Sequence, residues 1–165
     1  FVTILSVFSS RNFKFTNLKC QHHDPAFASF EVCRLSVKKR GIVSLDITCG
    51  IYKPPVTNVS LNIAVYKRAN GYRPFLYNVT QDICQYFQHP YRYPVLRVLL
   101  STFVKNSNIN HTCPYNHDII VKDLVFDEQM FNLLPLPDGD YMFKLIVFAY
   151  NDRKATVNVM FTISQ

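Results

Sequence analysis

Apolar and polar side chains alternate along most of this 165-residue chain. The alternation is clean in residues 59–66 and 157–163, so each segment is expected to form a strand with one buried face. Residues 141–150 are apolar on both faces, which is typical of a central strand. A period of two that recurs in this way predicts a mostly β protein.

About eight strands are expected, at residues 13–20, 30–37, 42–47, 59–66, 72–76, 119–126, 141–150 and 157–163. One segment follows a different rule, because Leu96, Leu99, Leu100 and Phe103 recur at spacings of three and four after Pro94. This spacing predicts an amphipathic helix over residues 94–105. A shorter helical turn is expected to begin at Thr80 or Asp82. Short antiparallel strands with disulfides and few glycines predict a secreted two-sheet β-sandwich.

Three sequons indicate export from the cytosol. They are Asn58-Val-Ser60, Asn78-Val-Thr80 and Asn110-His-Thr112, and each asparagine is a predicted glycosylation site. Residues 1–10 form an uncharged, largely apolar run that ends in two serines, and we interpret them as the remnant of a signal peptide. A first β-strand is the alternative interpretation of this run. Residues 11–165 are then expected to form one soluble, secreted domain.

The five cysteines are an odd number for an environment that favours disulfides. Cys49 lies on the apolar face of an alternating segment, so we expect it to be a buried free thiol. The other four, Cys20, Cys33, Cys84 and Cys113, can pair in three ways. Closeness in sequence favours Cys20–Cys33 and Cys84–Cys113, and the pairing stays open at this point.

The net charge of +7 includes basic groups at Lys38-Lys39-Arg40 and Lys67-Arg68, beside expected turns. One interpretation is that these are solvated hairpin tips, and the other is that they meet anionic lipid headgroups or a membrane surface. Nucleic acid is not an expected partner, because the chain carries secretory signals and no zinc-finger, RNP or helix-turn-helix pattern.

No catalytic motif is found in the chain. It lacks G-x-S-x-G, a P-loop and H-E-x-x-H, and its four glycines stand singly. A zinc site at Cys20-x-His22-His23 is disfavoured, since its cysteine fits a disulfide better and a fourth ligand is not evident. We therefore expect a protein that is not an enzyme and uses neither a metal nor a cofactor.

Several spaced blocks carry a resemblance to a known family. They are Phe13-x-Phe15-x-Asn17-x-x-Cys20, Cys33, Arg73-Pro74-x-Leu76-Tyr77-Asn78-x-Thr80-x-Asp82-x-Cys84, Asn110-x-Thr112-Cys113-Pro114-Tyr115 and Leu134-Pro135-x-Pro137-x-Gly139-x-Tyr141. This pattern resembles a large insect family of small secreted proteins that includes the chemosensory CheB proteins. That family is related to the ML lipid-recognition domains, such as the ganglioside-activator protein.

The resemblance implies an immunoglobulin-like β-sandwich whose sheets open to admit a lipid tail, and it implies binding rather than catalysis. Cys20, Cys33, Cys84 and Cys113 fall on the family's four cysteine positions, whereas Cys49 is an addition. The C-terminal cysteine that closes many ML domains is absent, since no cysteine follows Cys113.

Two functional hypotheses follow. The first is a secreted carrier of a lipid, fatty acid, sterol or pheromone-like hydrocarbon, acting as a monomer, with a membrane receptor or membrane surface as a further partner. Strand parity selects seven lining residues for it: Phe13, Leu45, Leu61, Ile63, Phe143, Leu145 and Phe161. The second is a filled sandwich that acts as an extracellular protein-interaction module. Parity alone does not separate a filled core from a hollow one.

Overall fold

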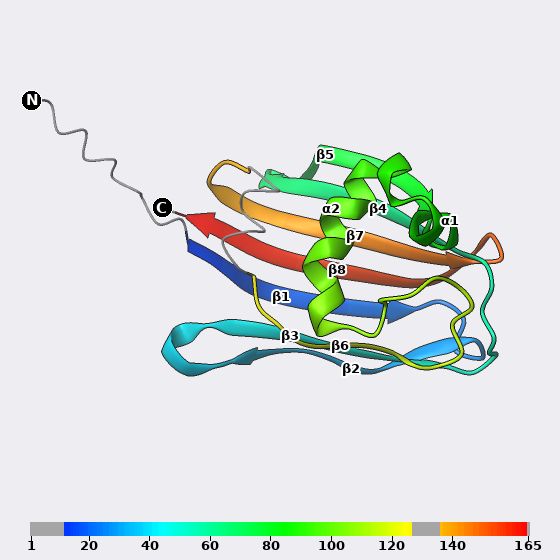
Figure 1. Ribbon diagram of the computed structural model, residues 1–165. Coiled ribbons are helices and arrows are strands. Elements are labelled where there is room, and N and C mark those ends of the chain that lie inside the picture. The colour runs from blue at the N-terminus through cyan, green and yellow to red at the C-terminus, as the bar shows by residue number, and fades with distance from the viewer. Residues whose placement is uncertain (1–11, 127–135, 165) are drawn as a thin grey trace, which may run out of the picture.

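The computed structural model describes residues 12–126 and 136–164, which fold as two antiparallel sheets stacked as layers (Figure 1). The five-stranded sheet has the order β1-β8-β7-β4-β5, and the three-stranded sheet has the order β2-β3-β6. The strands are β1 (Asn12–His22), β2 (Ala28–Val37), β3 (Val43–Ile51), β4 (Val59–Ala69), β5 (Gly71–Asp82), β6 (Ile119–Leu124), β7 (Gly139–Ala149) and β8 (Asp152–Ser164). The predicted two-sheet β-sandwich is confirmed. The expected signal-peptide remnant, residues 1–10, lies outside the described residues.

Both predicted helical segments are present. Helix α1 (Ile83–Gln88) begins after Asp82, whose side chain accepts a hydrogen bond from the backbone N–H of Gln85 at 3.0 Å. Helix α2 (Pro94–Phe103) begins with its proline in the first turn and buries Leu96, Leu99 and Leu100. The last two residues of the predicted helix, 104 and 105, belong instead to a 3₁₀ turn, η3 (Val104–Asn106). Two further 3₁₀ turns are η1 (Lys39–Gly41) and η2 (Pro90–Arg92).

The largest difference from the predicted strands concerns β5, which runs to Asp82 instead of ending near residue 76. Its second half pairs with β4 from Leu76 opposite Val65 to Asp82 opposite Ser60, although register shifts interrupt the ladder. Strand β7 lies between β4 and β8, so its predicted central position is confirmed. The hairpin between β4 and β5 turns at Gly71, whose φ of +79° falls in the left-handed region that glycine adopts without strain.

The two sides of the sandwich are closed by different means. On one side, the disulfide between Cys20 of β1 and Cys33 of β2 ties the edges of the two sheets together. On the other side, α2 runs from β5 toward β6 (Figure 1). Its first residue, Pro94, shares a groove with Tyr77 of β5, and Asn106 at the far end donates hydrogen bonds to the carbonyls of Lys122 and Asp123. The helix therefore covers the second side, where the disulfide between Cys84 and Cys113 also links α1 to the segment before β6.

The interior between the sheets contains two clusters of buried side chains. One, which we call the aromatic cluster, is built on the rings of Phe13, Phe15, Phe126, Tyr141 and Phe161. The other is mainly aliphatic, and it lies between the sheets and the two α-helices. The second cluster encloses the cavity described next.

Candidate functional site

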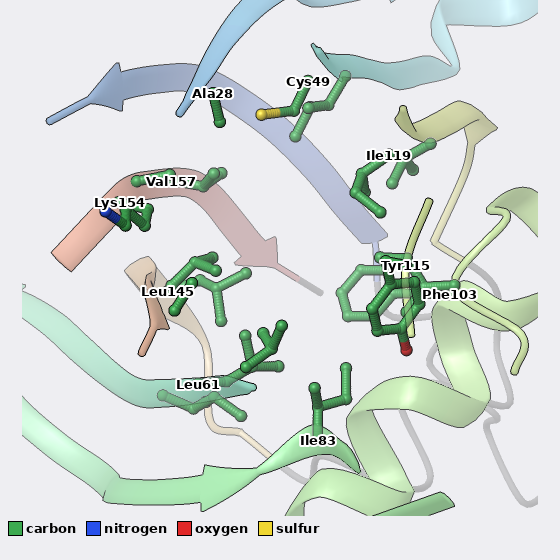
Figure 2. Close-up of a pocket in the computed structure, with 18 of the residues that line it drawn as sticks. Ala28, Cys49, Leu61, Ile83, Phe103, Tyr115, Ile119, Leu145, Lys154 and Val157 are labelled. Carbon is green, nitrogen blue, oxygen red and sulfur yellow. The ribbon is translucent and has the colours of Figure 1, made fainter. Parts of the chain in front are cut away.

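A cavity of about 210 Å³ lies between the two sheets and beneath α2. Strands of both sheets line it together with α1, α2 and the segment that leads to β6. Its wall consists almost wholly of aliphatic and aromatic side chains. Figure 2 labels ten of the lining residues: Ala28, Cys49, Leu61, Ile83, Phe103, Tyr115, Ile119, Leu145, Lys154 and Val157.

Five of the seven lining residues selected by strand parity contribute to this wall, namely Leu45, Leu61, Ile63, Phe143 and Leu145. They come from β3, β4 and β7, so both sheets contribute. Leu45 and Phe143 also pack against the aromatic cluster, which places them at the boundary between the two clusters.

Phe13 and Phe161 lie elsewhere, and this departs from the expectation. Their ring centroids are 5.0 Å apart in a stacked arrangement within the aromatic cluster, and Phe161 also stacks on Tyr141 at 5.5 Å. Both residues point between the sheets as parity predicts. However, they lie at the end of the strands where large rings occupy the space.

Helix α2 supplies the side of the cavity that lies between the sheet edges. Leu96, Leu99, Leu100 and Phe103 line the cavity, and these are the four residues whose spacing predicted the helix. Ile83 of α1 adds to the same side. The apolar face of the predicted helix is thus part of the cavity wall, a role that helical spacing alone does not assign.

The segment before β6 carries a second group of lining residues that the sequence did not reveal. Tyr115 is buried, lines the cavity and donates its hydroxyl hydrogen to the carbonyl oxygen of His111 at 2.7 Å. Burial raises the pKa of Tyr115 to about 12. The disulfide between Cys84 and Cys113 ties this segment to α1. Tyr115 pairs with Val56 through an isolated β-bridge and belongs to no strand. Its position is therefore not marked by the alternation that identifies strand residues.

Two histidines, His111 and His117, contact each other in the same segment before β6. The Nε2 atoms of His111 and His117 lie 2.7 Å apart, and the amide of Asn108 contacts Nδ1 of His117 at 3.1 Å. Asn108 also donates to the carbonyl of Asp118 at 2.6 Å. These contacts are local, and they hold the backbone that presents Tyr115 to the cavity.

Both disulfides match the pairs favoured by closeness in sequence, and Cys49 is free and buried, so these predictions are confirmed. Two disulfides indicate that the protein folds in an oxidising environment. The Cys49 thiol lines the cavity, and burial raises its pKa to about 11, with smaller contributions from the charges of Asp118 and Glu31. It is therefore a neutral thiol at physiological pH.

The polar features that the sequence singled out lie outside the cavity wall. Asn58, Asn78 and Asn110 are all exposed, as attachment of an oligosaccharide requires, and their glycosylation stays a prediction. Lys39 and Arg40 form part of the turn η1, and Lys67 lies over the ring of Phe75 at 5.4 Å. Among the basic residues described, it is Lys154 that contributes to the lining.

Two features are absent from the described part of the chain, a cluster of potential metal ligands and a helix able to cross a membrane. Residues 12–126 and 136–164 contain no cluster of three or more histidine, cysteine, aspartate or glutamate side chains able to hold a metal ion. Cys20, the cysteine of the disfavoured zinc site, is bonded to Cys33. Within the same residues, no helix has the length and apolar character needed to cross a membrane.

Comparison with known proteins places the chain in a family without assigning it an activity. No curated protein matches it. Residues 61–143 match the model of a family described as "Protein of unknown function (DUF1091)". The match covers about half of the chain and includes most of β4, both α-helices and the Cys84–Cys113 disulfide. This protein therefore belongs to the DUF1091 family.

Proposed function

We propose that this protein is a secreted, non-enzymatic binding protein that holds a hydrophobic small molecule between its two sheets. The ligand class comprises lipids, fatty acids, sterols and pheromone-like hydrocarbons, and the role is transport or presentation, including chemosensory presentation. One observation carries the proposal, which is the apolar cavity between the sheets and α2. A pocket with a mostly apolar wall is the usual form of a site for a small apolar ligand.

The size of the cavity limits what it holds in this conformation. Its 210 Å³ exceeds the roughly 150 Å³ of an apolar cavity that takes up benzene, and lies below the ~300–1,000 Å³ of drug-sized pockets. This conformation therefore suits a small apolar molecule or one end of an alkyl chain. We expect a longer ligand to require a displacement of α2, whose C-terminal end is held near β6 by the hydrogen bonds from Asn106 to Lys122 and Asp123.

Location outside the cell is part of the proposal. Two disulfides and three exposed sequon asparagines support it. The resemblance to the CheB proteins and to ML lipid-recognition domains supports both the location and the ligand class. A membrane receptor or membrane surface is the proposed site of delivery, and the basic turn at Lys39 and Arg40 is available to meet anionic headgroups.

The first test asks whether the protein carries a ligand. Native mass spectrometry and solvent extraction of protein secreted from insect cells should detect a bound apolar molecule. Added straight-chain methyl esters should bind at one per chain. Because each buried methylene contributes about 0.8 kcal/mol, affinity should rise about fourfold per carbon until the cavity is full. Protein that is empty and excludes every ester offered would show that the proposal is wrong.

A matched pair of variants locates the site. Val157→Phe places a ring inside the cavity and is expected to reduce ester binding at least tenfold. Val37→Phe makes the same change on β2 at a position that is 76% exposed, and it should leave binding unchanged. Equal binding by the wild type and Val157→Phe would place the ligand outside this cavity.

The alternative function, an extracellular protein-interaction module, is favoured by one feature of the surface. Edge strand β5 exposes Tyr72, Phe75, Leu76 and Tyr77 beside the charged Arg73. An edge strand with exposed aromatic side chains is able to pair with a strand of another protein. If the cavity proves empty, this strand is the place to begin a search for protein partners.

A further inference from the structure

Within residues 12–126 and 136–164, Lys154 is the charged residue that lines the cavity, and Figure 2 shows it at the opposite end of the lining from Phe103 and Tyr115. We propose that the cavity accepts uncharged apolar ligands, such as hydrocarbons and esters, and rejects the carboxylate of a free fatty acid. This inference rests on the proposed function and narrows its ligand class.

The ammonium group of Lys154 already interacts with three other side chains of the protein. Its Nζ lies 2.8 Å from Oδ2 of Asp24 and 3.0 Å from Oδ2 of Asp152. It also lies 4.5 Å from the centroid of the Phe27 ring, in cation–π geometry. An ammonium has three donor hydrogens, and three neighbouring groups already compete for them. The Lys154 side chain is 11% exposed and that of Asp24 is 33% exposed, so water screens this pair less than the pair with Asp152, whose side chain is 68% exposed.

The charges around Lys154 leave no unneutralised positive charge for an anionic ligand. The hydrogen bond from Lys154 lowers the pKa of Asp24, and the hydrogen bond to Asp24 raises the pKa of Lys154, so both are charged at neutral pH. Two carboxylates face one ammonium, and Lys53 adds a weaker positive influence on Asp24. A ligand carboxylate would therefore approach two like charges.

The rest of the described lining offers a carboxylate little compensation. The Tyr115 hydroxyl hydrogen is donated to His111, and the Cys49 thiol is a weak donor directed at the carbonyl of Gly50. The strands that form the walls use their backbone N–H groups in ladder pairing. Burying an ionised carboxylate without hydrogen-bond donors is strongly unfavourable, whereas burying an ester removes far less hydration.

The test compares two ligands of equal chain length by isothermal titration calorimetry at pH 7.5. Methyl octanoate is expected to bind the wild-type protein at least tenfold more tightly than sodium octanoate. If octanoate binds as tightly as the ester or more tightly, this inference is overturned while the proposed function stands. If neither ligand binds and the secreted protein is empty, both fail together.

A double variant tests the electrostatic reason. Asp24→Asn/Asp152→Asn leaves Lys154 without a carboxylate partner, so octanoate should bind at least threefold more tightly than to the wild type. Asp138→Asn/Asp140→Asn makes the same change in net charge at exposed positions outside the cavity and should leave both ligands unaffected. Unchanged binding of methyl octanoate serves as the check that each variant is folded. The inference would be overturned if Asp24→Asn/Asp152→Asn bound methyl octanoate normally but bound octanoate no more tightly than the wild type does.

Discussion

The aromatic cluster and the cavity lie along the same strands and differ in what fills them. Strand β7 contributes Tyr141 to the aromatic cluster and Leu145 to the cavity, and β8 contributes Phe161 and Val157 in the same way. At one end, stacked rings fill the space between the sheets. At the other, smaller side chains leave a cavity of about 210 Å³. The packed rings at one end of the sandwich stabilise the fold. We infer that the looser packing at the other end leaves space for a ligand.

Truncating one large side chain in the aromatic cluster and one in the cavity wall should give the largest difference in stability. Phe161→Ala removes a ring that stacks on Phe13 and Tyr141, and it should lower the free energy of unfolding by about 3–5 kcal/mol. Leu145→Ala removes a side chain that already faces empty space, so its cost should be about 2 kcal/mol, at the low end for such changes. Urea denaturation of both variants without ligand measures the difference. Equal losses would mean that the cavity is filled in solution.

Substitutions that enlarge a side chain should have the opposite pattern, with the greater loss of stability in the aromatic cluster and little loss at the cavity. Val65→Phe adds a ring to the filled end and should destabilise the protein by about 1–3 kcal/mol through overpacking. Val157→Phe adds the same ring where space exists and should leave stability nearly unchanged, or raise it by about 1 kcal/mol. Thermal unfolding of the two ligand-free variants compares them directly. A Val157→Phe variant as unstable as Val65→Phe would argue that the lining cannot accommodate added volume.

This contrast explains which parts of the molecule the sequence was able to predict. Alternation identifies the strand segments and the inward faces, because the side of a strand on which a residue lies depends on its parity. Leu61, Ile63 and Leu145 were placed in the cavity wall for that reason. Phe13 and Phe161 have the correct parity but lie at the other end of the strands. Position along a strand relative to the opposite sheet depends on register and sheet stacking, which a local pattern does not encode.

The remaining features of the site depend on contacts between distant segments. Lys154 meets Asp24 across 130 positions of the chain, so neither residue is marked by its neighbours in sequence. Tyr115 reaches the cavity through a bridge to Val56 and a disulfide-tied segment. The helix α2 was predicted from its spacing, yet its role as the cover between two sheet edges follows from where β5 and β6 lie. Tertiary placement decided these roles.

The smallest expected effect reports whether the cavity is dry. Burial raises the pKa of the Cys49 thiol from an ordinary value of 9.0 to about 11. Below pH 9 the thiol is neutral in both folded and unfolded chains and does not affect stability. Above pH 9 the unfolded chain loses this proton first, so stability should fall as pH rises, by about 1 kcal/mol at pH 10. Urea denaturation at pH 8 and pH 10 measures the loss.

Cys49→Ala isolates this contribution, because other groups also titrate in alkali. Tyr115, with its raised pKa of about 12, adds a loss that begins mainly above pH 10 and is common to both proteins. The variant should therefore lose about 1 kcal/mol less than the wild type between pH 8 and pH 10. An identical pH dependence would mean that water hydrates the thiolate inside the cavity. A water-filled cavity would remove the main favourable term for binding an apolar ligand, since the wall would already be occupied by solvent.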